Sequence, residues 1–399
     1  MTDFPLTSLL VVIAVAFAAP FLLALVPRVR LPEPVLEILA GIVLGPSLLN
    51  VVQFDTPVAV LSFLGLSFLL FLAGMEISFD KLRGRPLELA AASFALSIGL
   101  GLAVGLGFHA MGLVRVPLYI AVALLATSLG LVVPILADSG EAGSPFGQLV
   151  IAAASLADFG AVVLLSLFFS SQAGDVTTRL LLLGALAITG VVVAVTMIRA
   201  ERLTIVSRVF ARTHGTTAEL RVRGAVLLLV AFAALARSFG VELILGAFLA
   251  GAVLSLADRD GLMRHPEFEL KLRAVGYGLL IPVFFVGTGI QFDLNSLLAS
   301  ADGLLRIPLF VAGLLVVRGL PAVLYAGTVG PRRSLAAGLL QATSLPFLVT
   351  AATIGARLGI ISQAASAGLV AAGLVSVIVF PLLALTLLRS STSPAPAPG

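Results

Sequence analysis

One stretch of the sequence, residues 145–171, reads PFGQLVIAAASLADFGAVVLLSLFFSS and carries a single charged side chain, Asp158. About 20 apolar residues are enough for an α-helix to cross the hydrocarbon core of a membrane. A charged side chain at the bilayer centre costs about 2.5–3.5 kcal/mol on insertion scales, and such residues usually mark the pathway of an ion or a proton. We therefore predict a membrane-spanning helix here, with Asp158 as its functional residue.

The rest of the chain has a similar composition. Of its 399 residues, 60% are hydrophobic and 11% are charged, against about 25% charged in a typical soluble domain. Apolar runs follow one another, whereas a β-barrel would show alternating segments of about ten residues. We predict an all-α polytopic protein that forms a single domain in the lipid bilayer, residues 1–399. The tail, residues 390–399, is rich in Pro, Ser and Ala, and we expect it to be disordered.

The sequence also excludes several kinds of site. Cysteine is absent and the three histidines are scattered along the chain, so we expect no disulfide, no metal site and no cofactor. The net charge of +4 is explained by basic loops between the spans, and it does not indicate a nucleic-acid partner.

The distribution of basic residues predicts the orientation of the spans. We expect thirteen of them, at residues 6–26, 35–52, 58–77, 87–112, 117–138, 145–171, 177–198, 218–238, 240–256, 268–291, 303–327, 333–355 and 361–388. The loops on the N-terminal side hold five Lys or Arg, and those on the other side hold sixteen. Since basic loops remain in the cytoplasm, we expect a cell-membrane protein with its N-terminus outside and its C-terminus inside.

Three motifs recur in the same order in the two halves of the chain. Glu37-x-x-x-Gly41 matches Glu242-x-x-x-Gly246, FLAGMEISFD (71–80) matches FFVGTGIQFD (284–293), and Ala-Thr-Ser-Leu occurs at 126–129 and again at 342–345. Seven spans, an odd number, separate the members of each pair, so the two halves have opposite orientations. The sequence predicts two inverted six-helix repeats, spans 1–6 and 8–13, joined by span 7, a layout found in many secondary transporters.

The third motif predicts a break in each repeat. Hydroxyl residues are followed by proline in both copies, which weakens a helix while the hydroxyls can re-satisfy freed backbone groups. We expect crossed discontinuous helices here. The alternative is that small residues only allow close helix packing. The residues of the two expected breaks are Thr127, Ser128 and Pro134 in the first half and Thr343, Ser344 and Pro346 in the second.

The oxygen-bearing residues near Asp158 are the candidate ligands of an ion. Burial favours the protonated form of a carboxyl group and a nearby cation favours the ionised form, so Asp158 could bind either a proton or a metal cation. Ser155 shares its helix face, and Thr127 and Ser128 could offer oxygens that suit a hard cation. The alternatives are that Asp158 is a structural carboxylate paired with a basic residue and that Ser155 bonds its own backbone.

Other charged residues lie in or near the spans. Arg318 stays protonated and could balance Asp158 or the negative helix ends at the crossing, or snorkel to an interface. Glu76 and Glu242 are secondary candidates that could line a cavity or lie at an interface. Glu37 and Glu88 are expected at the membrane–water boundary, in contact with solvent.

These motifs resemble those of the monovalent cation:proton antiporters, in particular the group of bacterial sodium/proton and potassium/proton exchangers. The segments that carry the resemblance are GIVLGPSLLN, FLAGMEISFD, LLATSLGLVVPIL, SLADFGAVVLLSL, LGAFLAGAVLSL and IPVFFVGTGIQFDL, spread over nearly the whole chain. The resemblance implies a homodimer, with residues 6–77 and 218–291 as the dimer scaffold. It also implies an ion-transporting core at residues 87–171 and 303–388, with 177–198 as a linker helix.

One position departs from the family pattern. The residue before the functional aspartate is usually polar or acidic in the family, and here it is Ala157. In the family a single acid is associated with electroneutral exchange, so the resemblance implies one-for-one exchange. Arg318 matches the position of the family's basic residue.

We therefore expect an antiporter that exchanges Na⁺ or K⁺ for H⁺ by alternating access at Asp158, and not an enzyme. One alternative is a transporter of an organic anion or metabolite, in which Arg318 holds a carboxylate. Another is a membrane sensor that transports nothing. An intramembrane enzyme is the least expected, because the sequence shows no His-Glu-x-x-His, no paired midspan aspartates and no activated nucleophile.

Overall fold

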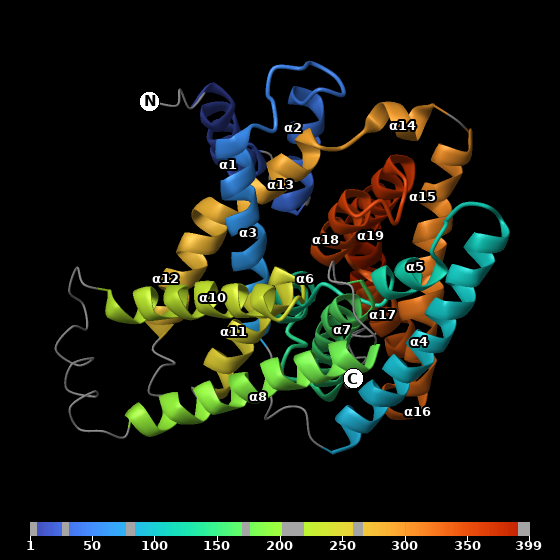
Figure 1. Cartoon of the computed structure of the whole chain (residues 1–399). Helices are drawn as coiled ribbons and strands as arrows, with labels where there is room; N and C mark the ends of the chain where they lie inside the picture. The colour runs from blue at the N-terminus through green and yellow to red at the C-terminus, as the bar shows by residue number, and fades with distance from the viewer. Residues whose placement is uncertain are drawn as a thin grey trace, which may run out of the picture. The chain divides into compact units, whose positions relative to one another are not determined.

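The computed structural model describes residues 6–25, 32–76, 84–169, 176–201, 219–257, 266–299 and 301–389 (Figure 1). Within these ranges the chain forms helices and connecting turns and no strand, so the all-α fold is confirmed. Among the described residues, nine helices are long and apolar enough to cross a membrane. The tail, residues 390–399, lies outside the described residues.

The remaining expected spans are short, broken or charged. Helix α2 (Glu33–Leu44) has 12 residues and α11 (Leu243–Ala257) has 15. The expected span 35–52 was too long, because α2 ends at Leu44. The following Gly45 has an extended backbone, and Pro46 cannot donate to a helical carbonyl. Helix α10 (Leu220–Ser238) carries three arginines, and the expected span 117–138 is broken into α5 (Pro117–Ala123) and α6 (Leu129–Asp138).

The helices fall into two compact units, Met1–Ser78 with Ser166–Phe292, and Phe79–Leu165 with Asp293–Gly399. Unit 1 also contains α1 (Leu6–Leu25), α3 (Thr56–Met75), α8 (Val176–Glu201), α12 (Pro266–Val275), the π-helical turn η2 (Gly276–Leu280) and α13 (Ile281–Ile290).

Glycines set the close packing inside unit 1. A Cβ atom at Gly41 of α2 would overlap the carbonyl oxygen of Val286 in α13. A Cβ atom at Gly251 of α11 would overlap the carbonyl oxygen of Phe71 in α3. Helix α2 (the second expected span) thus packs on α13 of the tenth, and α11 (the ninth) packs on α3 (the third). Each of these pairs joins one helix from each half, as two inverted copies of one motif produce.

Unit 2 contains most of α7 (Pro145–Phe169) together with the two broken spans. The first break separates α5 from α6, and the second separates α17 (Pro331–Ala342) from α18 (Pro346–Arg357). The other helices of this unit are α4 (Arg85–Ala110), α14 (Leu294–Leu298), α15 (Ala301–Leu314), η3 (Leu315–Gly319), η4 (Leu320–Tyr325), α16 (Ala326–Val329) and α19 (Gln363–Arg389).

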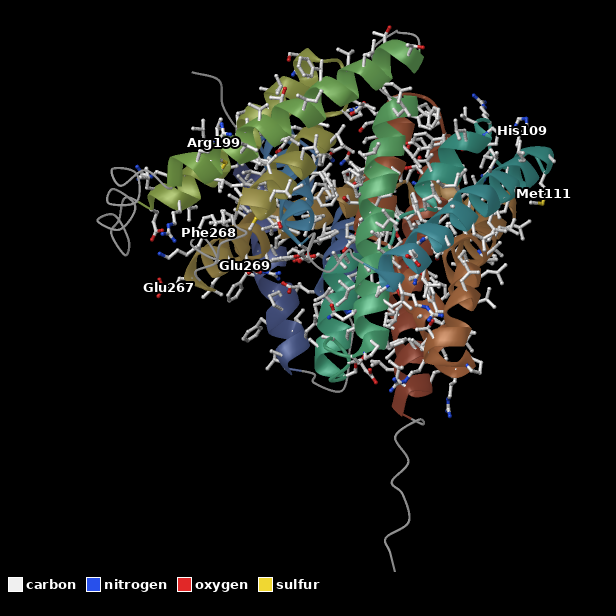
Figure 2. The ribbon with its side chains drawn as sticks, turned by 90° about the horizontal axis from the view of Figure 1, so that it is seen from below. His109, Met111, Arg199, Glu267, Phe268 and Glu269 are labelled. Atoms are coloured by element: carbon white, nitrogen blue, oxygen red, sulfur yellow. The ribbon has the colours of Figure 1, made fainter. Side chains whose placement is uncertain are left out.

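Charged side chains lie at the ends of several helices. Arg199 lies in the last turn of α8, and Glu267 and Glu269 lie in the first turn of α12 (Figure 2). His109 lies in the last turn of α4. These positions suit the helix dipole, whose N-terminus favours acids and whose C-terminus favours bases.

Candidate functional site

The two breaks of unit 2 are in direct contact. Ser128 and Thr343 both have extended backbones, and the Ser128 N–H donates a hydrogen bond to the Thr343 carbonyl oxygen at 2.9 Å. The ends of four half-helices therefore meet at one point. Each such end leaves backbone groups without a partner in its own helix, and the surrounding side chains supply the missing partners.

Asp158 of α7 supplies them at the first break. Its carboxylate accepts hydrogen bonds from the Thr127 N–H at 3.0 Å and from the Leu129 N–H at 3.2 Å. These groups lie at the N-terminus of α6, where the helix dipole favours a negative charge. The Asp158 side chain is half-buried while the neighbouring Ala157 is fully buried. The carboxylate is thus held by the break and stays partly accessible.

Thr127 connects this carboxylate to the second half of the unit. Its hydroxyl donates to the Gln341 carbonyl oxygen at 2.7 Å, at the end of α17. The same hydroxyl accepts a hydrogen bond from Arg318 Nε at 3.0 Å. A threonine hydroxyl has one donor and two acceptor positions, so one acceptor position remains. The expected ion ligand is therefore also the residue that ties the two breaks together.

Arg318 lies in the π-helical turn η3 and is fully buried. Besides Thr127, it donates to Ser97 Oγ in α4 at 3.1 Å and to the Ala153 carbonyl oxygen in α7 at 3.5 Å. A buried guanidinium that bonds the first break and two helices, α4 and α7, does not snorkel to an interface. Single π-helical turns are frequent at functional sites, and this one brings the arginine into the crossing.

At the second break a serine occupies the place of the aspartate. The Ser344 N–H donates to Ser376 Oγ in α19 at 3.1 Å, and Ser376 Oγ lies 3.0 Å from the Ser344 carbonyl oxygen. Ser376 was not among the residues expected from the sequence. The Ala-Thr-Ser-Leu pair has an offset of 216 residues, which predicts a counterpart to Asp158 near Leu374. The two motifs that come earlier in the chain have smaller offsets, so the offset between the halves increases along the chain. This increase indicates that the counterpart of Asp158 lies slightly beyond Leu374.

The remaining residues of the two breaks have separate roles. Ser128 precedes the first residue of α6 and makes no capping bond with its side chain. The Thr343 hydroxyl donates to the Leu339 carbonyl oxygen at 3.1 Å, within its own helix. Pro346 is the first residue of α18, where proline is favoured. Pro134 lies inside α6 and not at the break.

Ser155 lies one turn before Asp158 on α7 and is buried. Gln341 is also buried, and its side-chain amide donates to the Tyr325 hydroxyl at 3.1 Å. Gln341 and Ser97 were not expected from the sequence, since an isolated polar residue in an apolar run has many structural roles.

The two secondary candidates belong to unit 1, whereas the residues around Asp158 belong to unit 2. Glu76 ends α3, and its Oε1 lies 3.2 Å from Arg273 Nη2. Glu242 is buried directly before α11. Glu37 was expected to contact solvent, and this expectation was wrong: the side chain is 1% exposed in α2. The tight packing of α2 on α13 explains the difference, because it encloses a position that the linear sequence places near a helix end.

The arrangement around Asp158 suits the binding of small cations. A carboxylate has about four lone-pair positions, and the two N–H groups occupy two of them. A carboxylate oxygen can accept a proton or contact a hard cation, for which oxygen ligands are preferred. A bound proton removes the charge that attracts the cation, so the two compete for one group.

Comparison with known proteins identifies the family. The family model described as "Sodium/hydrogen exchanger, transmembrane" matches residues 13–389. The putative Na⁺/H⁺ antiporter YjbQ of Bacillus subtilis (strain 168) is 34% identical over 81% of this chain and 53% of its own length. The probable Na⁺/H⁺ antiporter 3 of Methanocaldococcus jannaschii is 25% identical over 80% of this chain and 87% of its own length. The chain spans about half the length of the Bacillus relative.

The fold has a counterpart among solved structures. The sodium proton antiporter MjNhaP1 from Methanocaldococcus jannaschii superimposes with a TM-score of 0.66, covering 96% of this chain and 98% of that one. The sequences are 18% identical, so this likeness concerns the fold. The family resemblance predicted from the sequence motifs is confirmed by the family match over residues 13–389. The chain is a multi-pass membrane protein that belongs to the sodium/hydrogen exchanger family.

Proposed function

We propose that the protein is a secondary antiporter that exchanges Na⁺ or K⁺ for H⁺ across the membrane. The observation that carries the proposal is the position of Asp158, half-buried on an apolar helix and held by the N–H groups of a helix break. The names of the relatives support this class of substrate. They include Na⁺/H⁺ antiporters and a putative K⁺ efflux antiporter KefB of Alkalimonas amylolytica, 26% identical over 68% of this chain and 40% of its own length.

In this proposal the exchange is electroneutral and uses alternating access. Asp158 binds a cation on one side, releases it on the other and returns with a proton. Because residue 157 is alanine, there is no second acid beside Asp158. The single carboxylate therefore carries one cation in one direction and one proton in the other. Ser155 and Ser128 are the proposed additional oxygen ligands, while Thr127 and Arg318 hold the site in shape.

Unit 2 would be the transporting core and unit 1 the scaffold of a homodimer. Both breaks, Asp158 and Arg318 lie in unit 2. Glycine-mediated backbone contacts give unit 1 a close-packed interior, which suits a rigid support. The excess of Lys and Arg on one side supports an outside N-terminus and a cytoplasmic C-terminus.

The engagement of Arg318 argues against transport of an organic anion. Its guanidinium donates to three acceptors of its own unit and is 0% exposed. A substrate carboxylate would have to displace those acceptors.

Proteoliposomes with an imposed pH gradient test the proposal. Addition of Na⁺ or K⁺ should collapse the gradient in vesicles with the wild-type protein, with an initial rate that does not change when a membrane potential is imposed. Asp158→Asn should leave the gradient intact, and Asp55→Asn, which alters an aspartate that caps α3, should behave as wild type. A gradient that no cation collapses, or that collapses equally with Asp158→Asn, would refute the proposal.

A further inference from the structure

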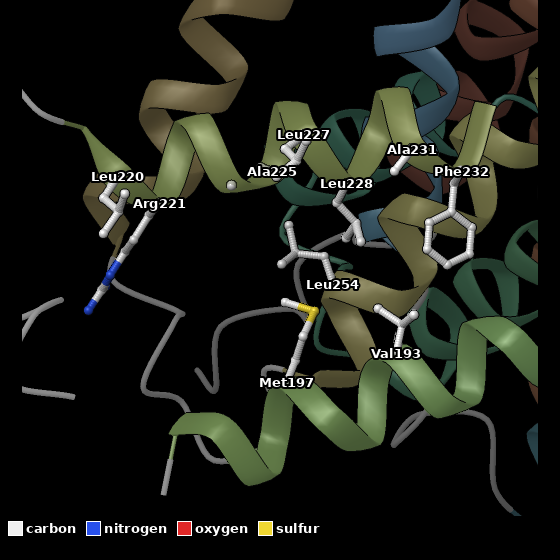
Figure 3. A pocket seen from close by; sticks show the side chains of 11 residues that line it. Val193, Met197, Leu220, Arg221, Ala225, Leu227, Leu228, Ala231, Phe232 and Leu254 are labelled. Atoms are coloured by element: carbon white, nitrogen blue, oxygen red, sulfur yellow. The ribbon is translucent and has the colours of Figure 1, made fainter. Parts of the chain in front are cut away.

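A cavity of about 380 Å³ lies in unit 1 between α8, α10 and α11. Eleven residues line it, and apart from Arg221 they are apolar or glycine. Figure 3 shows the apolar side chains of α10 and α8 facing this space, with Arg221 at one end and Phe232 at the other. Sites that bind small molecules have volumes of about 300–1,000 Å³ and are mostly apolar with a few polar groups.

The α10 side of the cavity is about as long as half the hydrocarbon core of a membrane. Its lining on α10 runs from Leu220 to Phe232, which at 1.5 Å per residue is about 18 Å. The hydrocarbon core of a bilayer is about 30 Å thick, so the lining extends slightly further than half of it. Leu227, which also lines the cavity, is 71% exposed. The cavity is therefore open to the protein surface at Leu227.

The end of the cavity at Arg221 is basic. Arg223 follows on α10, and Arg199 lies two residues after the lining residue Met197 of α8. The neighbouring acid Glu219 is engaged by Lys271 at 2.6 Å. Basic pockets between membrane helices on the cytoplasmic side bind the headgroups of anionic lipids.

We propose that this cavity binds an anionic phospholipid, with an acyl chain along α10 and the phosphate at Arg221. The charge of this end selects the headgroup, and the apolar lining accepts the chain. A neutral ligand would leave the arginine without a role in binding, and a soluble anion would leave the apolar length empty. The residues that line it belong to unit 1, whereas the residues around Asp158 belong to unit 2.

Gly224 provides a clean variant for the test. It lines the cavity, and a Cβ atom built there would meet no atom within 4 Å. Gly224→Leu therefore adds an apolar side chain whose Cβ atom has open space, and it replaces a poor helix former by a good one. Gly184 of α8 is a matched control, because a Cβ atom there also meets nothing within 4 Å and the residue does not line the cavity. Arg221→Gln removes the charge, with Arg237→Gln at the other end of α10 as its control.

The measurement is the melting temperature of the purified full chain in detergent, titrated with phosphatidylglycerol or with phosphatidylcholine. Phosphatidylglycerol should raise the melting temperature of the wild type and both controls, with phosphatidylcholine much less effective. Gly224→Leu should melt normally without lipid and lose the lipid response. Arg221→Gln should bind phosphatidylglycerol about fivefold more weakly.

Three results would overturn the proposal. The first is a full phosphatidylglycerol response in Gly224→Leu, and the second is an equal response to both lipids in the wild type. The third is a lipid-independent change in the mass of the Gly224→Leu particle in solution, which would make the cavity an interface between two copies of the chain.

Discussion

Asp158 and Ser376 hold equivalent positions beside the two helix breaks. Asp158 of α7 accepts the Thr127 N–H at 3.0 Å, and Ser376 of α19 accepts the Ser344 N–H at 3.1 Å. Each helix break leaves a backbone N–H group without a partner in its own helix. A carboxylate accepts this N–H in one half, and a neutral hydroxyl accepts it in the other. One half of a symmetric scaffold carries the charge, and the other half provides support.

Ser376→Ala should destabilise the protein without changing the ion preference. The variant leaves the buried Ser344 N–H without an acceptor, which costs about 1–3 kcal/mol. Thermal unfolding in detergent measures this as a lower melting temperature. Thr386→Ala on the same helix is the control, since its hydroxyl is exposed and bonds the Leu383 carbonyl oxygen of its own helix. Equal melting temperatures for the two variants would show that Ser376 does not support the break.

Thr127→Val and Thr127→Ser should differ. Valine keeps the shape but removes the hydroxyl that bonds both Gln341 and Arg318. The cost should be about 1–3 kcal/mol, with slower cation exchange because the site around Asp158 loosens. Serine keeps the hydroxyl and should retain most of the rate. The two variants are compared by their initial rates in proteoliposomes and by their melting temperatures. A fully active Thr127→Val would contradict the proposed role of the hydroxyl in holding the site around Asp158.

Arg318→Met should be more harmful than Arg318→Lys. Methionine removes the guanidinium that donates to Thr127, Ser97 and Ala153, which costs about 1–3 kcal/mol for a buried polar group left without its partner, and it removes the cation near Asp158. Lysine keeps the charge but replaces the fork of the guanidinium by a single nitrogen. Melting temperatures should fall in the order wild type, Arg318→Lys, Arg318→Met. Arg115→Met, at an exposed loop position, should change stability by less than about 0.5 kcal/mol. The reverse order for the two Arg318 variants would argue against a structural network.

Gly251→Ala tests the packing of unit 1. The added methyl group would overlap the Phe71 carbonyl oxygen, so α11 and α3 must separate, at a cost of about 1–3 kcal/mol. Gly107→Ala on α4, where a Cβ atom meets nothing within 4 Å, should instead stabilise the protein by about 0.4–1 kcal/mol. Chemical denaturation in mixed micelles measures both, and a stabilising Gly251→Ala would contradict the described packing.

The sequence allowed the fold to be predicted because membrane helices leave strong signals. Apolar runs give the helices, and repeated motifs such as Ala-Thr-Ser-Leu at 126–129 and 342–345 give the symmetry and the two breaks. Asp158 could be singled out because a charge in a long apolar run is rare and costly.

The details of the site depended on contacts between distant segments. The Arg318 guanidinium bonds Ser97, which is 221 residues away in the chain, and no local pattern indicates such a pair. Pro134 suggested a break at the wrong place, because proline also occurs inside a helix whose neighbours satisfy the freed carbonyl groups. Glu37 was placed in solvent because its burial results from the packing of α2 on α13.

Proton release on cation binding tests the central claim most directly. Na⁺ or K⁺ is added to the purified protein in weakly buffered detergent solution, and the pH change is recorded at several starting values. If the cation and the proton compete for Asp158, the wild type and the Asp55→Asn control should release up to one proton per chain, and Asp158→Asn should release none. Equal release from Asp158→Asn and the wild type would show that the competition occurs elsewhere.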